Sequence, residues 1–149
     1  MKKIEVISGE SIEDALASSN RQYLVGNLSI PQELDYLRDD NVEVGITLYK
    51  EDTIEKPHYH TTTTEYIYVV EGETKYIDVN TKEETIVKKG DFFLIRKGIT
   101  YAQKSKAGLK LLFFKCPSGN DKVSVKYGEG LEEWFQSSER LGSDHLSKF

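Results

Sequence analysis

The sequence predicts an all-β protein in which short antiparallel strands form a sandwich or barrel. Between Val42 and Tyr127, runs of β-branched and aromatic residues alternate with turn signals, a pattern typical of closely spaced strands. The gaps between these runs are too short for the helical crossovers that parallel strands require. Helical patterns occur only towards the two ends of the chain. We therefore expect one antiparallel barrel with short terminal helices.

Eight strands are expected in this central region, and each ends at a turn signal such as Gly90, Gly98 or the segment "PSGND". Their expected ranges are 42–49, 65–70, 74–79, 85–89, 91–95, 100–105, 109–116 and 122–127. The segment that contains His58 and His60 also has strand character. A further strand is expected at 22–30, where it would cover the edge of its own sheet or of a partner's sheet.

Three short helices are expected outside the barrel, at 8–19, 31–39 and 131–141. The first has Ser8 or Ser11 as a candidate N-cap, and its apolar residues are spaced for one face. The second places Pro31 at a possible first helical position. The third has an apolar stripe that suits packing against the barrel.

The chain is expected to form a single domain. The barrel would occupy about 42–127, with a strand and helix arm at 1–41 and a helical tail at 128–149. His145, in the tail, is expected to be a surface residue rather than a ligand.

The composition excludes several classes of partner. The formal net charge of −5 and the pI near 5.3 argue against a general nucleic-acid or anionic-membrane surface. No apolar run approaches the roughly 20 residues of a membrane span, and the start of the chain lacks the apolar core of a signal peptide. The single cysteine, Cys116, cannot form an intrachain disulfide. We expect a cytoplasmic protein.

The segment "KPHYHTTTTEYIYVVEGE" carries the strongest functional signal. His58 and His60 lie two apart on a strand and therefore point to the same side. The four threonines let the chain turn into the next strand, where Glu65, Ile67 and Val69 share one face. If that face looks into the barrel, two imidazoles and one carboxylate meet there. They would suit one divalent transition metal: Fe, Mn, Ni, Co or Zn. The alternatives are an exposed histidine pair or a buried polar network.

These motifs resemble the cupin superfamily. The first cupin motif is matched in full by His58, His60, Glu65 and Gly72 at the family's spacing. The second is matched in part: Gly90 and Gly98 are in register, whereas Arg96 replaces the usual proline and Tyr101 replaces the histidine that is usually the fourth ligand. The resemblance covers roughly residues 42–116. It implies an antiparallel double-stranded β-helix, the jelly-roll barrel, commonly dimeric and with the metal inside the barrel mouth.

Tyr101 is the main departure from the family pattern, and its role stays open. It could ligate the metal as a phenolate, but its ordinary pKa near 10 makes this demanding. It could instead be an acid or base that contacts the substrate, and Glu65 is a second candidate for proton transfer. Gln103 shares the strand parity of Tyr101 and could be a neutral oxygen ligand or a substrate contact. Tyr49 is another candidate substrate contact, because one or two of the strand tyrosines are expected to line the barrel; the remaining ones would be sheet or dimer contacts.

Three functions fit such a site. The leading one is metal-assisted isomerisation or epimerisation of a small polar, carbohydrate-type substrate, because the small single-domain cupins that the chain resembles include proteins of this kind. The others are a metal-dependent dioxygenase and a cupin that binds a small ligand without chemistry. A homodimer is the expected assembly, with no nucleic acid or membrane as partner.

Overall fold

The computed structural model describes residues 2–137, which form eleven strands and two helices. In chain order these are α1 (Gly9–Ser18), β1 (Arg21–Gly26), β2 (Leu37–Arg38), β3 (Glu43–Leu48), β4 (Thr53–His60), β5 (Thr64–Glu71), β6 (Glu73–Asp78), β7 (Glu84–Lys88), β8 (Phe92–Ile95), β9 (Tyr101–Ser105), β10 (Lys110–Cys116), β11 (Lys122–Ser124) and α2 (Glu129–Gln136). Within this part of the chain, no helix has the length and apolar character needed to cross a membrane.

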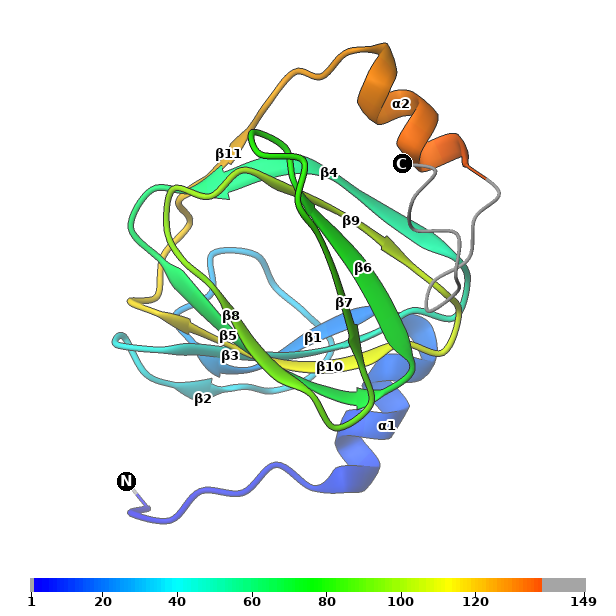
Figure 1. Cartoon of the computed structure of the whole chain (residues 1–149). Helices are drawn as coiled ribbons and strands as arrows, with labels where there is room; N and C mark the ends of the chain where they lie inside the picture. The colour runs from blue at the N-terminus through cyan, green and yellow to red at the C-terminus, as the bar shows by residue number, and fades with distance from the viewer. Residues whose placement is uncertain (1, 138–149) are drawn as a thin grey trace.

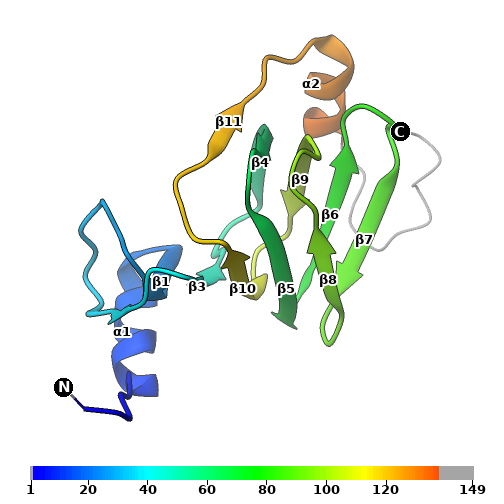
Figure 2. The same cartoon turned by 90° about the vertical axis from the view of Figure 1, so that its left-hand side faces the viewer.

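The strands form two facing sheets that enclose a barrel (Figures 1 and 2). One sheet has the order β2-β1-β3-β10-β5-β8 and the other has the order β11-β4-β9-β6-β7. Every pairing is antiparallel except the two-residue parallel contact between β1 and β2. The prediction of an all-β antiparallel double-stranded β-helix with short helices is therefore confirmed.

Side-chain alternation on β5 shows how the barrel interior is filled. Glu65, Ile67 and Val69 are buried, whereas Tyr66 and Tyr68 are exposed on the outer face. This two-residue period is what a strand with one buried face dictates. The main core is apolar and aromatic, and its buried members come from both sheets: Tyr49, Ile67, Val69, Tyr76, Val87, Tyr101, Leu109, Leu111 and Phe113.

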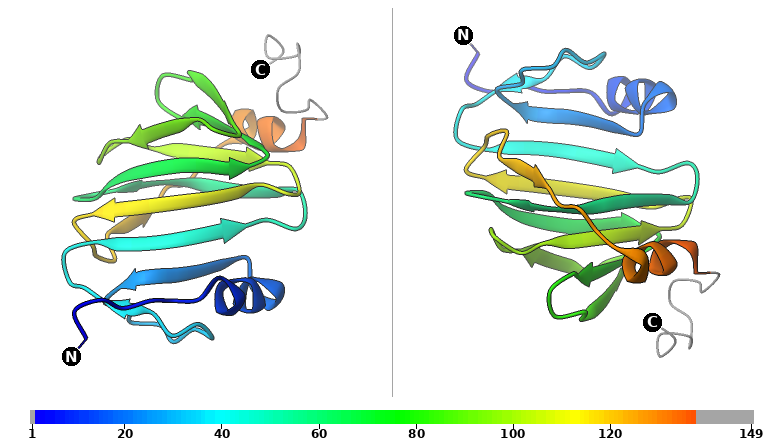
Figure 3. Two further views of the ribbon diagram at one scale, coloured as in Figure 1. Left: turned by 90° about the horizontal axis from the view of Figure 1, so that it is seen from below. Right: turned by 90° about the horizontal axis from the view of Figure 1, so that it is seen from above.

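The two terminal helices lie on opposite sides of the strand stack (Figure 3). Ser8 caps α1, and its hydroxyl accepts a hydrogen bond from the Ser11 amide. In α2, Trp134 is buried against Ile77 and Ala102 on the outside of the five-stranded sheet. Of the helix expected at 131–141, positions 138–141 lie outside the described residues, as does His145.

The helix expected at 31–39 is wrong. This segment contains no helix, and its only regular element is β2. Its polar groups bond largely to β1: the Gln32 side chain pairs with both backbone groups of Tyr23, and the Leu34 amide donates to Gln22 Oε1. A nine-residue helix is marginal alone, so these contacts with the sheet decide the conformation.

The N-terminal strand is shorter than expected, since β1 ends at Gly26 rather than at residue 30. It pairs with β3 of its own sheet. The sheet therefore begins before Val42. At the other end β11 stops at Ser124, short of the expected 127.

Candidate metal centre

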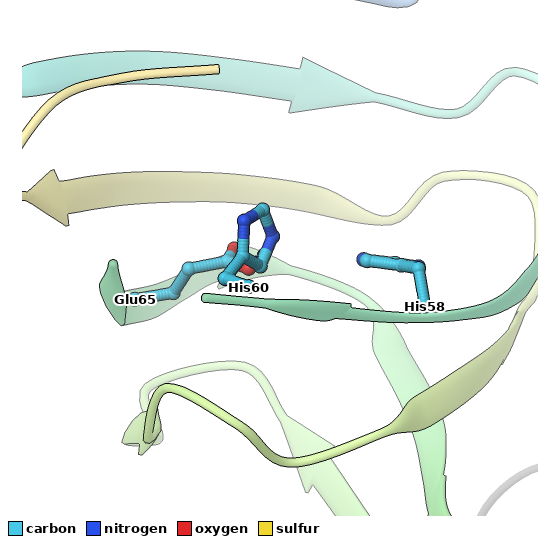
Figure 4. A group of neighbouring side chains, drawn as sticks. All are labelled: His58, His60 and Glu65. Atoms are coloured by element: carbon cyan, nitrogen blue, oxygen red, sulfur yellow. Dashed lines mark ion pairs between the residues drawn. The ribbon is translucent and has the colours of Figure 1, made fainter. Parts of the chain in front are cut away.

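Three potential metal ligands meet where the two sheets face each other. His58 and His60 lie at the end of β4 in one sheet, and Glu65 lies at the start of β5 in the other. One ligand atom from each lies within 4.8 Å of the others, and all three side chains are buried. Figure 4 shows both imidazoles rising from the same side of β4, with the Glu65 carboxylate beside His60. The three residues that the sequence analysis predicted as ligands therefore lie together in the structure.

The hydrogen bonds of the two histidines leave their Nε2 atoms for the centre. His58 Nδ1 lies 3.0 Å from the Lys56 carbonyl, and His60 Nδ1 lies 2.7 Å from Asp121 Oδ1. Since both partners accept, both Nδ1 atoms donate these bonds. His60 Nε2 lies 2.9 Å from Glu65 Oε1 and, without an ion, donates to that oxygen, whereas a bound cation would take up the Nε2 lone pairs instead. Metal-binding histidines are commonly oriented in this way. The donor set therefore fits a divalent cation.

Asp121 was not identified from the sequence. Its second carboxylate oxygen accepts hydrogen bonds from the amides of Thr62 and Thr63 and from the Thr62 hydroxyl. Although burial opposes ionisation, the hydrogen bonds from His60 and these amides hold the pKa of Asp121 well below its usual value. The carboxylate thus fixes both the ring of His60 and the threonine turn that follows it.

Tyr101 lies beside the ligands and is tied to one of them. Its hydroxyl donates to Glu65 Oε1 at 2.9 Å, and His60 Nε2 is 2.9 Å from the same oxygen. The Tyr101 and His58 rings are 4.5 Å apart at their centroids. Burial and the charge of Glu65 raise the pKa of Tyr101 well above its ordinary value. Tyr101 is therefore a neutral phenol that donates a hydrogen bond.

Burial sets the direction of the pKa shift at His58, whereas hydrogen bonds and charge set it at His60 and Glu65. Burial lowers the pKa of His58 and keeps it neutral. Burial acts in the same direction on His60, but its hydrogen bonds with Glu65 and Asp121 outweigh this and raise the pKa of His60. Burial alone would raise the pKa of Glu65; the hydrogen bond and charge of His60 lower it instead. Glu65 is therefore an anionic carboxylate, as a metal ligand would need to be.

The ligands open onto a cavity of about 170 Å³ inside the barrel. Tyr49 and Gln103, the expected substrate contacts, both line it. Tyr49 Oη accepts from Arg21 Nη2 at 3.2 Å, and Gln103 Nε2 donates to Thr74 Oγ1 at 2.8 Å. Tyr66 and Tyr68, on the outer sheet face, do not contribute.

Several charged residues of the cavity were missed by sequence reasoning, among them Arg21 and Glu55. Arg21 enters from β1, far from either motif, and nothing in the sequence linked it to the site. Glu55 Oε1 lies 3.6 Å from His58 Nε2 and 3.5 Å from Lys122 Nζ. Strict alternation would place Glu55 and His58 on opposite faces, but the pairing of β4 with β9 shifts register between them. This bulge turns both side chains inward.

Comparisons with known proteins agree with this architecture. Residues 45–112 match the family of cupin domains. Together with the jelly-roll fold and the complete first motif, this match identifies residues 45–112 as a cupin domain. No curated protein sequence matches the chain.

Solved structures with the same fold include three bacterial proteins. A double-stranded β-helix protein of Klebsiella pneumoniae is 15% identical, with a TM-score of 0.57 over 85% of this chain and 100% of its own. KdgF of Halomonas is 14% identical, with a TM-score of 0.51 over 68% of this chain and 80% of its own. A Bacillus halodurans protein is 15% identical, with a TM-score of 0.55 over 79% and 85%. At these identities the likeness concerns the fold.

Proposed function

We propose that this protein is a metal-dependent cupin enzyme that isomerises or epimerises a small polar, carbohydrate-type substrate. The observation that carries the proposal is the position of the Tyr101 phenol, a neutral proton donor held on Glu65 Oε1 beside the two histidines. Isomerisation and epimerisation at a carbon next to a carbonyl require a proton to leave carbon and a proton to be delivered. The cavity offers groups for both tasks.

His58, His60 and Glu65 would hold one divalent ion, which would act as a Lewis acid that polarises a substrate carbonyl. Tyr101 would donate a proton to the developing oxyanion or orient the substrate. Glu65, which accepts the Tyr101 hydrogen bond, would hold the phenol in place, and the proton would return to Tyr101 when the oxyanion becomes a carbonyl again. Glu55 supplies a second carboxylate at the cavity wall, 3.6 Å from His58 Nε2, where it can accept a proton from substrate carbon. Fe, Mn, Ni, Co and Zn all accept this donor set.

A cupin that binds a ligand without chemistry is the second candidate. The favouring observation is the chain of hydrogen bonds from Tyr101 through Glu65 and His60 to Asp121, which satisfies every member without an ion. Such a network can be a stable structural element by itself. Metal content separates the two candidates.

The test is elemental analysis of protein purified without added metal, alongside His58→Ala. We expect near-stoichiometric metal in the wild type and its loss in the variant. His145→Ala, which removes the third histidine of the chain, is the control and should keep the metal. Turnover of aldose and ketose substrates would then establish the isomerase, and oxygen consumption would assign a dioxygenase instead. A wild type without metal that is stabilised by sugars, with no turnover, would favour the binding protein.

The proposal includes a homodimer. Tyr66 and Tyr68 pair with Leu94 and Phe92 across β5 and β8, and all four are exposed on the outer face of the six-stranded sheet. The side chain of Phe92 is 61% exposed. A contiguous aromatic face of this kind is typical of a protein interface. A second copy of the same chain is the commonest partner at such an interface, because most oligomers are symmetric homo-oligomers.

A further inference from the structure

Among the described residues, Arg21 is the one arginine that lines the cavity, and its hydrogen bonds there go to uncharged groups. Its Nε donates to Thr47 Oγ1 at 3.0 Å and its Nη2 donates to Tyr49 Oη at 3.2 Å. Both acceptors are neutral hydroxyls. The guanidinium also lies against the Phe113 ring, 5.6 Å from its centroid. These contacts fix the side chain in place and leave three of its five N–H donors for another partner.

No carboxylate within residues 2–137 lies at ion-pair distance from Arg21. The charge of Glu55 acts on it from farther away. Glu55 itself is shared between Lys122 at 3.5 Å and His58 at 3.6 Å. A half-buried guanidinium without a close counter-ion is costly, because desolvation is not repaid by a paired charge. An anionic ligand would supply that charge.

The balance of charge in the cavity favours the same ligand. Three cationic side chains line it, namely Arg21, Lys115 and Lys122, and three anionic ones, namely Glu55, Glu65 and Asp121. A divalent cation on the histidine and glutamate ligands would leave this wall net positive. Low-dielectric cavities of one sign concentrate ligands of the opposite sign.

We propose that Arg21 anchors the carboxylate of a small organic acid, such as a sugar acid, whose other end faces His58, His60 and Glu65. The inference rests on the proposed function, whose substrate class it specifies. The planar guanidinium fork matches a carboxylate with two parallel hydrogen bonds. At about 170 Å³ the cavity is smaller than pockets for drug-sized ligands, roughly 300–1,000 Å³. The ligand is therefore of monosaccharide size or less. A phosphate offers the same charge, and the experiment separates the two.

The test measures binding of D-glucuronate, D-glucose and inorganic phosphate by calorimetry to metal-loaded protein. D-Glucose is the uncharged control, because it differs from D-glucuronate in carrying a hydroxymethyl group in place of the carboxylate. The variant is Arg21→Gln, and Arg38→Gln, on the exposed side of β2, is the control. Metal content is measured on every sample. We expect D-glucuronate to bind the wild type at least tenfold more tightly than D-glucose, and Arg21→Gln to lose that preference with its metal intact. Arg38→Gln should behave as the wild type.

Each other outcome has its own meaning. Equal binding of the two sugars, or an unchanged preference in Arg21→Gln, overturns the inference and leaves the metal site standing. If phosphate binds in an Arg21-dependent way and D-glucuronate does not bind, the carboxylate proposal is overturned and the anion at Arg21 is a phosphate. If the wild type holds no metal, the proposed function fails, and an Arg21-dependent preference for D-glucuronate still supports the anion site. Should Arg21→Gln not fold, Arg21→Lys and the wild-type comparison of the two sugars decide.

Discussion

Tyr101 and Glu65 share a hydrogen bond of 2.9 Å that joins β9 to β5, and so links the two sheets across the barrel interior. The position where a cupin usually supplies a fourth metal ligand here supplies a donor to the third ligand. Because the raised pKa of Tyr101 keeps the phenol protonated, we expect it to act on the carboxylate and the substrate rather than on the ion.

Tyr101→Phe should therefore keep the metal and lose most of the activity. The ring contacts with His58 and Tyr76 remain, so the loss of folding free energy should be near that of one hydrogen bond, about 1 kcal/mol. Metal analysis, turnover and thermal unfolding measure the three effects. If the variant loses metal as completely as His58→Ala, Tyr101 is a ligand after all.

Asp121→Asn should weaken metal binding without abolishing it. Asparagine keeps one acceptor for the threonine amides but no longer offers His60 a carboxylate. The His60 ring is then held less firmly, and its Nε2 becomes less basic. Changes of this kind typically reduce metal affinity by about 10–100-fold. A competition titration with a chromophoric chelator gives the value. Asp52→Asn, another loop carboxylate that accepts a backbone amide, from Ala107, is the control and should bind as the wild type does.

Gly72→Ala should be more destabilising than Gly90→Ala. Both glycines have positive φ, +82° and +90°, which costs an L-residue about 1–2 kcal/mol. Only at Gly72 does an added Cβ also meet backbone, 2.9 Å from the Leu109 Cα, whereas nothing lies within 4 Å at Gly90. Chemical denaturation of both variants compares them directly. Equal losses would mean that the backbone conformation alone selects glycine at the end of the first motif.

The proposed homodimer predicts a specific effect of charge on the outer face that carries Tyr66, Tyr68, Phe92 and Leu94. Phe92→Glu combined with Tyr68→Glu should convert a dimer into a monomer, since two charges would be buried across an apolar interface. Ile4→Glu, at a side chain that is 82% exposed elsewhere on the chain, is the control. Light scattering at micromolar concentration gives the mass. A wild-type species of only 17 kDa would count against the dimer.

The barrel and the meeting of His58, His60 and Glu65 could be predicted from the sequence because each depends on a local period. Two-residue alternation puts His58 with His60 and aligns Glu65 with Ile67. The threonine turn then brings the two strands together. Local patterns of this kind can be interpreted from the sequence without knowledge of tertiary contacts.

The remaining features depend on contacts between distant segments. The helix expected at 31–39 fails because Gln22 and Gln32 give that segment partners on β1. Glu55 was hidden because a bulge breaks the strand period just before His58. Asp121 lies 61 residues after His60 in an ordinary-looking turn, and only the fold makes them neighbours.

Asp121, which orients His60, lies outside the segment that matches the cupin family, whereas the candidate metal ligands lie inside it. Residues 45–112, which match the family, contain both histidines and Glu65 but end before Asp121 and β11. The strand that follows Asp121 pairs with the ligand-bearing end of β4, from His60 to His58. A related protein could have an identical first motif but a different sequence after this segment. It would keep the donor atoms and lose the carboxylate and the strand that orient them. Sequence similarity within the shared segment alone therefore does not predict the metal affinity of such a site.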